Sequence, residues 1–224
     1  MHDAALVFDL DGTLVDTVYE HVMAWHQALR ECDIDLSIWR IHRRIGMSGG
    51  LLVRALAREL GYELEQETID RLQREHGRIY REQNKEIAPL PGARDLLQML
   101  TREGVAWAIA TSSHRETAEA ALRALDLPRD TVVITHDEVA RAKPNPDLFL
   151  TAARALDVAL ENTFVVGDSI WDMLAARRAR ALGIGLLSGG YGLSELVDAG
   201  AYRVYEDPAD LAANLHELGL RLPN

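Results

Sequence analysis

Residues 4–13 of the chain read AALVFDLDGT, and this stretch already indicates the class of fold. The first five residues are a short apolar run, which is typical of a strand buried on both faces in a parallel sheet. The run ends at Asp9 and Asp11, and Gly12 permits a tight turn directly after them. Because α/β sheets bind ligands at the carboxyl ends of their strands, we expect polar chemistry at this strand end.

From residue 92 onward, predicted strands and helices alternate. Apolar strands are expected over 105–110, 131–134, 163–166 and 182–187. Helices are expected over 92–103, 114–125, 146–156 and 169–180. This alternation predicts an α/β fold with a Rossmann-like parallel sheet that carries helices on both faces and includes the N-terminal strand.

Residues 16–85 have a different character. Apolar side chains such as Val22, Trp25 and Leu29 recur at helical spacing, and we find no convincing strand pattern there. Pro89 and the pair Pro91-Gly92 mark the return to the alternating pattern. The expected organisation is a catalytic core of residues 1–15 and 86–224, with a small all-helical domain, residues 16–85, inserted after the first strand.

Composition narrows the classes of function. The formal net charge of −11 and the pI of about 5.2 argue against nucleic acid as a partner. No apolar run is long enough to span a bilayer. The single cysteine, Cys32, fits a reducing cytoplasm. The N-terminus (Met1–Ala4) has no basic region, and the apolar run after it ends at Asp9, which favours a strand over a signal peptide. The sequence does not decide between a monomer and a homodimer.

Four polar clusters follow predicted strands, so they should meet at one edge of the sheet. They are Asp9–Thr13, Thr111–Ser113, Lys143 and Asp168–Asp172. Phosphoryl transfer needs a nucleophile, a proton donor and positive charge for the phosphate oxygens. Thr111, the N–H groups of its loop and Lys143 can supply the last of these. The crowded carboxylates would repel one another, and Mg²⁺, which prefers oxygen ligands, resolves the repulsion.

These residues resemble the four motifs of the haloacid dehalogenase superfamily, in the right order. The matching stretches are Asp9–Thr13, Thr111, Lys143-Pro144 and Gly167–Ser169 with Asp172. The resemblance covers nearly the whole chain. The inserted helical domain resembles the α-helical cap of this superfamily, and the chain is most similar to its phosphoglycolate-phosphatase and beta-phosphoglucomutase branch.

The resemblance implies a role for each matching residue. Asp9 would attack phosphorus and form an aspartyl-phosphate. Asp11 would protonate the leaving alcohol and then deprotonate the attacking water. Thr111 and Lys143 would bind the phosphoryl group. The candidate metal ligands are Asp9, Asp11 through its carbonyl oxygen, Asp168 and Asp172. The candidate substrate-binding residues are Leu10, Ser112 and Ser113 in the core, and His21 and Gly49 in the cap.

Several of these residues have ordinary structural explanations when taken singly. Thr111 after a strand often caps a helix, and Ser113 with Glu116 fits a capping box. Asp168 and Asp172 also suit a helix N-terminus. Lys143 alone would suit a solvated surface. The order and context of the motifs favour the functional interpretation.

The expected function is therefore a magnesium-dependent phosphatase acting on a small phosphate monoester, phosphoglycolate or a small sugar phosphate. A beta-phosphoglucomutase is the first alternative, because Asp16-Thr17, His21 and Ala24-Trp25 resemble that branch. Gly49 stands where that branch carries an arginine for the second phosphate, although Arg43, Arg44 or Arg54 are possible substitutes.

Three further alternatives are weaker. A non-catalytic phosphometabolite-binding protein would be expected to lack one of the chemical groups, yet all are present. The second aspartate, Asp11, argues against a dehalogenase. A phosphonate hydrolase would need a cap lysine, and Lys85 at the cap exit is the one candidate.

Overall fold

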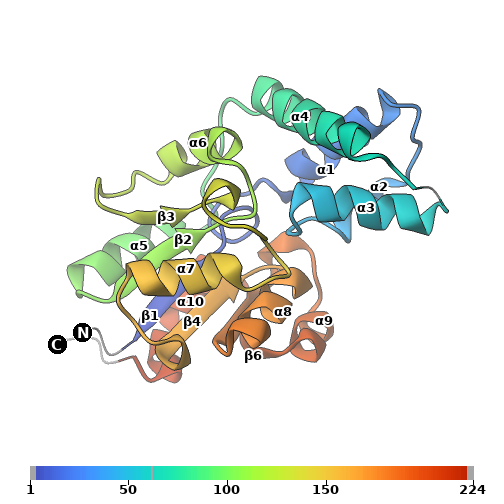
Figure 1. Cartoon of the computed structure of the whole chain (residues 1–224). Helices are drawn as coiled ribbons and strands as arrows, with labels where there is room; N and C mark the ends of the chain where they lie inside the picture. The colour runs from blue at the N-terminus through green and yellow to red at the C-terminus, as the bar shows by residue number, and fades with distance from the viewer. Residues whose placement is uncertain (1–3, 62, 221–224) are drawn as a thin grey trace.

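A computed structural model describes residues 4–61 and 63–220 of the chain. Its centre is a six-stranded parallel sheet with the strand order β3-β2-β1-β4-β5-β6 (Figure 1). The strands are β1 (Ala5–Phe8), β2 (Ala106–Ala110), β3 (Val132–Ile134), β4 (Thr163–Gly167), β5 (Leu182–Leu186) and β6 (Ala201–Tyr205). The N-terminal strand is thus a central one, and the predicted fold class is confirmed.

Helices cover both faces of the sheet (Figure 1). The helices on one face are α5 (Ala93–Arg102), α6 (Arg115–Ala124) and α10 (Pro208–Ala213). The other face carries α7 (Asp147–Ala155) and α8 (Ile170–Ala179). Strand β6 and helices α9 (Leu193–Ala199) and α10 lie beyond the last element that the sequence analysis assigned.

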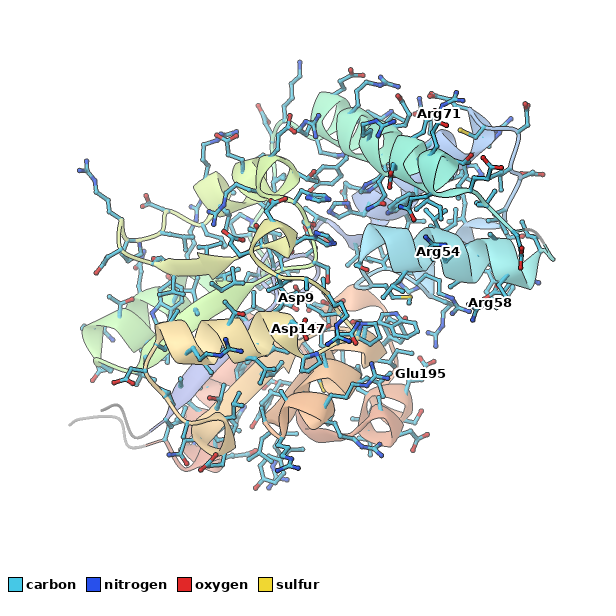
Figure 2. The ribbon with its side chains drawn as sticks, viewed as in Figure 1. Asp9, Arg54, Arg58, Arg71, Asp147 and Glu195 are labelled. Carbon is cyan, nitrogen blue, oxygen red and sulfur yellow. The ribbon has the colours of Figure 1, made fainter. Side chains whose placement is uncertain are left out.

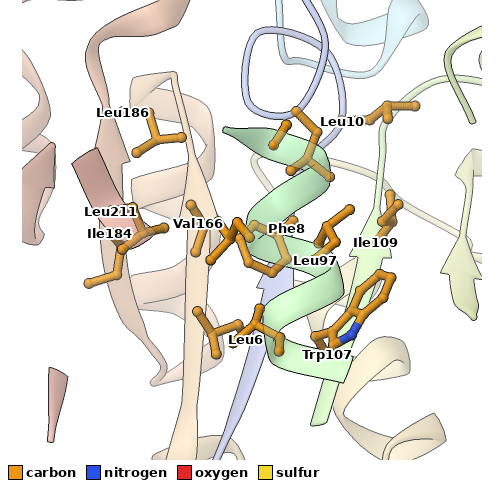
Figure 3. Close-up of a cluster of buried hydrophobic side chains, with 14 of the residues drawn as sticks. Leu6, Phe8, Leu10, Leu97, Trp107, Ile109, Val166, Ile184, Leu186 and Leu211 are labelled. Carbon is orange, nitrogen blue, oxygen red and sulfur yellow. The ribbon is translucent and has the colours of Figure 1, made fainter. Parts of the chain in front are cut away.

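The main hydrophobic core lies beneath α5. Leu6 and Phe8 of β1 point to this face and pack with Trp107 and Ile109 of β2 and Leu97 of α5 (Figure 3). Val7 points to the opposite face, where it packs under α7 and α8. A strand between two layers of helices must be apolar at every position, which explains the continuous run at its start.

The insertion forms a separate four-helix domain beside the carboxyl edge of the sheet (Figure 1). Its helices are α1 (Val18–Arg30), α2 (Ile38–His42), α3 (Gly49–Glu59) and α4 (Gln66–Gln83), and no strand occurs in the described part of the insertion. It has its own apolar cluster, to which Val22, Trp25 and Leu29 of α1 contribute. The predicted helical cap is present. The limits proposed for the two domains stay a prediction, and residues 1–3 and 221–224 of the core lie outside the described residues.

The cap is docked on the core. The Ser112 hydroxyl donates to the Gly46 carbonyl oxygen at 3.0 Å, and the Ser48 N–H donates to the Lys143 carbonyl oxygen at 3.1 Å. The Tyr191 hydroxyl adds a third such bond, to the Arg43 carbonyl oxygen, at 3.0 Å. The structure therefore shows the cap closed over the strand ends. Among the described residues, no helix combines the length and the apolar character needed to cross a bilayer.

Leu6→Ala should lower the free energy of unfolding by about 2–5 kcal/mol, because it leaves a cavity under α5. Leu193→Ala is the matched control, since Leu193 is 58% exposed while Leu6 is fully buried. Urea denaturation should place the midpoint of the control close to that of the wild type. Equal losses in the two variants would contradict this description of the core.

Candidate active site

Asp9 is held rigidly at the end of β1. Its N–H donates to the Val166 carbonyl oxygen at 2.8 Å, which extends the parallel pairing with β4 by one residue. The chain then turns sharply, and the Leu10 carbonyl oxygen accepts the N–H of Leu14 at 2.9 Å. Gly12 has φ of 83°, and a Cβ there would lie 2.7 Å from the Asp168 carboxylate. The turn therefore requires glycine at this position.

Lys143 lies at the centre of the site and is completely buried. Its ammonium group forms an ion pair with the Asp9 carboxylate and a second one with Asp172, whose Oδ1 is 2.8 Å from Nζ. A buried lysine keeps its charge only when such partners compensate for lost hydration. Burial alone would lower the pKa of Lys143, but Asp172 and Asp9 raise it above its usual value.

Asp168 completes a cluster of buried carboxylates. Oxygen atoms of Asp9, Asp168 and Asp172 lie within 4.8 Å of one another. One oxygen of Asp168 accepts a hydrogen bond from the Thr13 hydroxyl at 2.9 Å. With one lysine among them, these three carboxylates leave an excess of two negative charges when all are ionised. An all-oxygen donor set with this charge fits a divalent cation.

The pKa values of the cluster show how strongly its charges are crowded. Burial raises the pKa of Asp9 to about 7, Lys143 opposes the rise, and the charges of Asp172 and Asp11 add to it. Burial, Asp172 and Asp9 also raise the pKa of Asp168 well above its usual range. The cluster therefore favours any positive charge, either a proton or a metal ion.

Asp172 has two structural functions. Its Oδ2 accepts hydrogen bonds from the N–H and the hydroxyl of Ser169, at 3.1 and 2.5 Å, and so forms the capping box at the start of α8. Its Oδ1 faces Lys143. These contacts support a role in orienting Lys143, and metal binding by Asp172 stays a prediction.

Asp11 contacts three hydrogen-bonding side chains. Its carboxylate accepts from the Thr17 hydroxyl at 2.7 Å and from the Ser113 hydroxyl at 3.0 Å, and Nε2 of His21 lies 3.2 Å from Oδ1. Burial would raise its pKa, but the charge of His21 and the three hydrogen bonds outweigh burial and lower the pKa of Asp11 to about 2. His21, which the sequence analysis gave as a candidate substrate-binding residue of the cap, lines the cavity and contacts Asp11.

The loop after β2 contributes three neighbouring residues to the site. Thr111 is buried, and its hydroxyl oxygen accepts the Ser113 N–H at 3.0 Å. The capping box considered for Ser113 and Glu116 is wrong, because the Ser113 hydroxyl donates to Asp11 instead. Glu116 forms an ion pair with Arg81 of the cap at 3.1 Å. Helix α6 starts one residue later than that capping box requires, at Arg115 with His114 as its N-cap.

A cavity of about 80 Å³ lies between these residues and the cap. Asp9 is near the middle of the molecule, between core and cap (Figure 2). The core contributes Asp9, Asp11, Thr111, Ser112, Ser113, His114, Thr117 and Lys143; the cap contributes His21, Trp25, Ile45, Gly46, Met47, Gly49, Leu52, Gln73 and His76. Of these described lining residues, Lys143 is the one lysine or arginine.

Of the predicted substrate-binding residues, Gly49 lines the cavity, whereas the side chain of Leu10 does not. Gly49 lines the cavity at the start of α3, where a Cβ would lie 3.2 Å from both Gln73 and Trp25. The Leu10 side chain is fully buried in the main core, so a substrate contact from Leu10 would have to come from its main chain. Sequence reasoning missed Gln73 and His76 in the cavity wall, because they occur in a helix without a recognisable motif.

A parallel sheet with a helical cap over a carboxylate-lysine cluster defines a class of hydrolases. A family model of haloacid dehalogenase-like hydrolases matches residues 4–180, so the chain belongs to this family. The predicted superfamily is thereby confirmed.

Curated relatives cover most of the chain. The probable phosphatase IndB of Dickeya dadantii is 32% identical over 95% of this chain and 94% of its own length. The beta-phosphoglucomutase of Bacillus subtilis is 30% identical over 83% of this chain and 84% of its own. A phosphoglycolate phosphatase of Rhodospirillum rubrum is 29% identical over 92% of this chain and 88% of its own length. These relatives confirm the predicted branch, and with the family they confirm a phosphoric monoester hydrolase.

A solved structure is still more similar. A hydrolase from Pseudomonas syringae has 49% sequence identity and a TM-score of 0.94, over 96% of this chain and 99% of its own. The structural similarity therefore extends over both the core and the cap.

Mg²⁺ should stabilise the protein more at pH 7.5 than at pH 5. Because the folded-state pKa of Asp9 is raised from 3.8 to about 7, its protonated form stabilises the metal-free fold, and this stabilisation is lost as pH rises through about 7. At the higher pH the ionised cluster gains most from a cation. At a hundredfold excess over Kd the Tm should rise by about 5–10 °C.

Thermal unfolding with EDTA or Mg²⁺ at both pH values measures this effect. Asp168→Asn should remove most of the rise in Tm that Mg²⁺ causes. Asp130 is exposed, and Asp130→Asn should leave that rise unchanged. A shift that is equal at both pH values would contradict the proposed cause.

Proposed function

We propose that the protein is a magnesium-dependent phosphatase that hydrolyses a small phosphate monoester in the cytoplasm through an aspartyl-phosphate on Asp9. The observation that carries the proposal is that Asp9, Asp11 and Lys143 line one small cavity, with Asp168 beside Asp9. The family membership and the phosphatase relatives support the reaction class. The single cysteine supports a reducing compartment.

Asp9 is the proposed nucleophile. One carboxylate oxygen attacks phosphorus, the bond from phosphorus to the alcohol oxygen breaks, and Lys143 offsets the charge of the phosphoryl oxygens. Water then attacks the aspartyl-phosphate and releases inorganic phosphate. The Mg²⁺ that Asp9, Asp168 and the Asp11 carbonyl oxygen would hold supplies positive charge to the phosphoryl group.

Asp11 is the proposed acid and base. A pKa of about 2 keeps its carboxyl group ionised in the empty cavity, as activation of water in the second step requires. A phosphate ester beside it adds negative charge, which raises the pKa of Asp11 toward the protonated form that the first step requires. The same carboxyl group thus donates a proton to the alcohol and later accepts one from water.

The arginines of the cap favour hydrolysis over the mutase reaction. A mutase has to hold a second phosphate, and Arg43, Arg44 and Arg54 were the candidate substitutes for the residue missing at Gly49. Arg43 is paired with Glu195 across the cap-core boundary, and Arg44 is paired with Glu59. Arg54 contacts Gln66, is exposed, and lies on α3 apart from Asp9 (Figure 2). None of the three lines the cavity.

The cap side of the cavity supports a small substrate with an uncharged leaving group. It presents Trp25, Met47 and Leu52 as apolar surfaces, and Gln73 and His76 as polar groups. Such a wall suits hydroxyl groups of a small sugar or polyol phosphate. Phosphoglycolate is the second candidate, because the start of α3 at Gly49 offers main-chain N–H groups that can accommodate a carboxylate.

Asp9→Asn should lower kcat by at least about 10³-fold, since an amide cannot form the aspartyl-phosphate. Steady-state release of phosphate from p-nitrophenyl phosphate, with Mg²⁺ present, measures the loss. Asp130→Asn changes an exposed aspartate and should retain wild-type rates. Retained turnover in Asp9→Asn would refute the assignment of the nucleophile.

A panel of phosphate monoesters tests the substrate class. The value of kcat/KM should be higher for small sugar and polyol phosphates than for phosphoglycolate, and higher by a larger factor than for nucleotides. Added glucose 1,6-bisphosphate should not cause isomerisation of beta-glucose 1-phosphate. Isomerisation without net phosphate release would identify a mutase, and preference for phosphoglycolate would select the second candidate substrate.

A further inference from the structure

We propose that His114, His136 and Asp137 form a second metal site on the core, which binds Zn²⁺ and is distinct from the buried carboxylate cluster. Each of the three side chains offers one ligand atom, and these atoms all lie within 4.8 Å of one another. Among the described residues, this is the one such group besides the carboxylate cluster. The inference goes beyond the proposed function, since binding of an ion is measured without turnover.

The fold brings the three side chains together from two adjacent strands. His114 is the N-cap residue of α6 and ends the loop after β2. His136 and Asp137 follow β3, the neighbouring strand of the sheet (Figure 1). The His136 N–H donates to the Ser113 carbonyl oxygen at 3.0 Å, which joins the two loops through their main chains. The separation of the ligands is therefore set by rigid elements, as a metal site requires.

Asp137 is oriented by hydrogen bonds to one of its two carboxylate oxygens. Its Oδ2 accepts from the Arg115 N–H at 2.7 Å and from the Thr135 hydroxyl at 3.2 Å. Carboxylates that bind metals are commonly held by hydrogen bonds of this kind. The guanidinium of Arg115 donates instead to Glu138 at 3.0 Å. The other oxygen of Asp137, Oδ1, is thus directed to the histidines.

The two histidines stand close enough to share an ion with Asp137. Nδ1 of His114 is 2.6 Å from Oδ1 of Asp137, and the ring centroids of His114 and His136 are 4.6 Å apart. The ligand atoms of a tetrahedral Zn²⁺ site are roughly 3.3 Å apart. The His114 side chain is half exposed, so a movement of about 1 Å away from Asp137 admits the ion. Three protein ligands leave the fourth position to water.

The donor set determines which metal the site selects. Imidazole nitrogen suits Zn²⁺, whereas Mg²⁺ prefers carboxylate, carbonyl and water oxygens. Two neutral imidazoles and one carboxylate carry a single negative charge, which a divalent cation more than offsets. His114 also lines the catalytic cavity. Binding of Zn²⁺ therefore fixes the orientation of His114 and adds positive charge at the edge of that cavity.

Titration calorimetry with Zn²⁺, in excess Mg²⁺ to occupy the carboxylate cluster, measures the site. The wild-type chain should bind Zn²⁺, and His136→Ala should raise the Kd at least about tenfold, because residues that only orient a ligand already contribute roughly 10–100-fold. Asp137→Asn, which keeps an oxygen for the Arg115 N–H, should raise it similarly. His216→Ala is the matched control: it removes an exposed imidazole outside the group and should keep the wild-type Kd.

A second measurement identifies the ligands without any substitution. Imidazole ¹⁵N NMR of the wild-type protein should show coordination shifts of His114 and His136 when Zn²⁺ is added, while the signals of His216 stay in place. The NMR result stands even where a variant does not fold, and thermal unfolding of each variant separates loss of the site from loss of the fold.

Three results would overturn the site. They are the absence of Zn²⁺ binding, an unchanged Kd in folded His136→Ala, and coordination shifts at His21 and His76 in place of His114 and His136. The proposed function is tested separately by Asp9→Asn. Turnover without Asp9 would reject that function and would leave the Zn²⁺ site intact, whereas failure of the Zn²⁺ site would leave the phosphatase assignment unchanged.

Discussion

The site depends on one buried lysine between two carboxylates. Parallel strands bring Asp9 and Asp168 together at the edge of the sheet, where like charges destabilise the fold. Lys143 offsets part of this charge through Asp9 and Asp172, and Asp172 is itself fixed by the capping box of α8. An excess of negative charge remains, and it makes the site receptive to a cation. The same electrostatic imbalance thus explains the buried ion pairs and the fit to a divalent metal.

The two proposed catalytic aspartates, Asp9 and Asp11, differ in what holds them in place. Asp9 is fixed by main-chain pairing with β4, so its position does not depend on the cap. Asp11 is held by Ser113 of the core and by His21 of the cap, so its orientation does depend on docking. A nucleophile benefits from permanent preorganisation. An acid and base that is oriented by the closed cap acts after water has been excluded from the cavity.

Sequence patterns predicted the parts that are local. The apolar run before Asp9 and the alternation after residue 92 have short-range causes, and the motif residues converge because parallel strand ends must meet. Strand β6 escaped notice because an edge strand with exposed positions lacks the continuous apolar pattern. His76 escaped because its place in the cavity wall arises from the packing of α4 on α1. Ser113 likewise donates to Asp11 and does not cap a helix. This contact joins residues 102 positions apart, so no local pattern indicates it.

The same distinction explains why the reaction is better determined than the substrate. Chemistry at phosphorus needs groups at strand ends, and the fold places them with little freedom. Recognition of the leaving group falls to the cap, where side chains on α1, α3 and α4 enter the cavity according to helix packing. A glycine at position 49 lets α3 begin against Trp25 and Gln73, at a spacing that a larger residue would disturb. With the neighbouring arginines paired elsewhere, the closed cap contributes shape and neutral hydrogen-bonding groups, which is the recognition that hydrolysis of a single small phosphate ester requires.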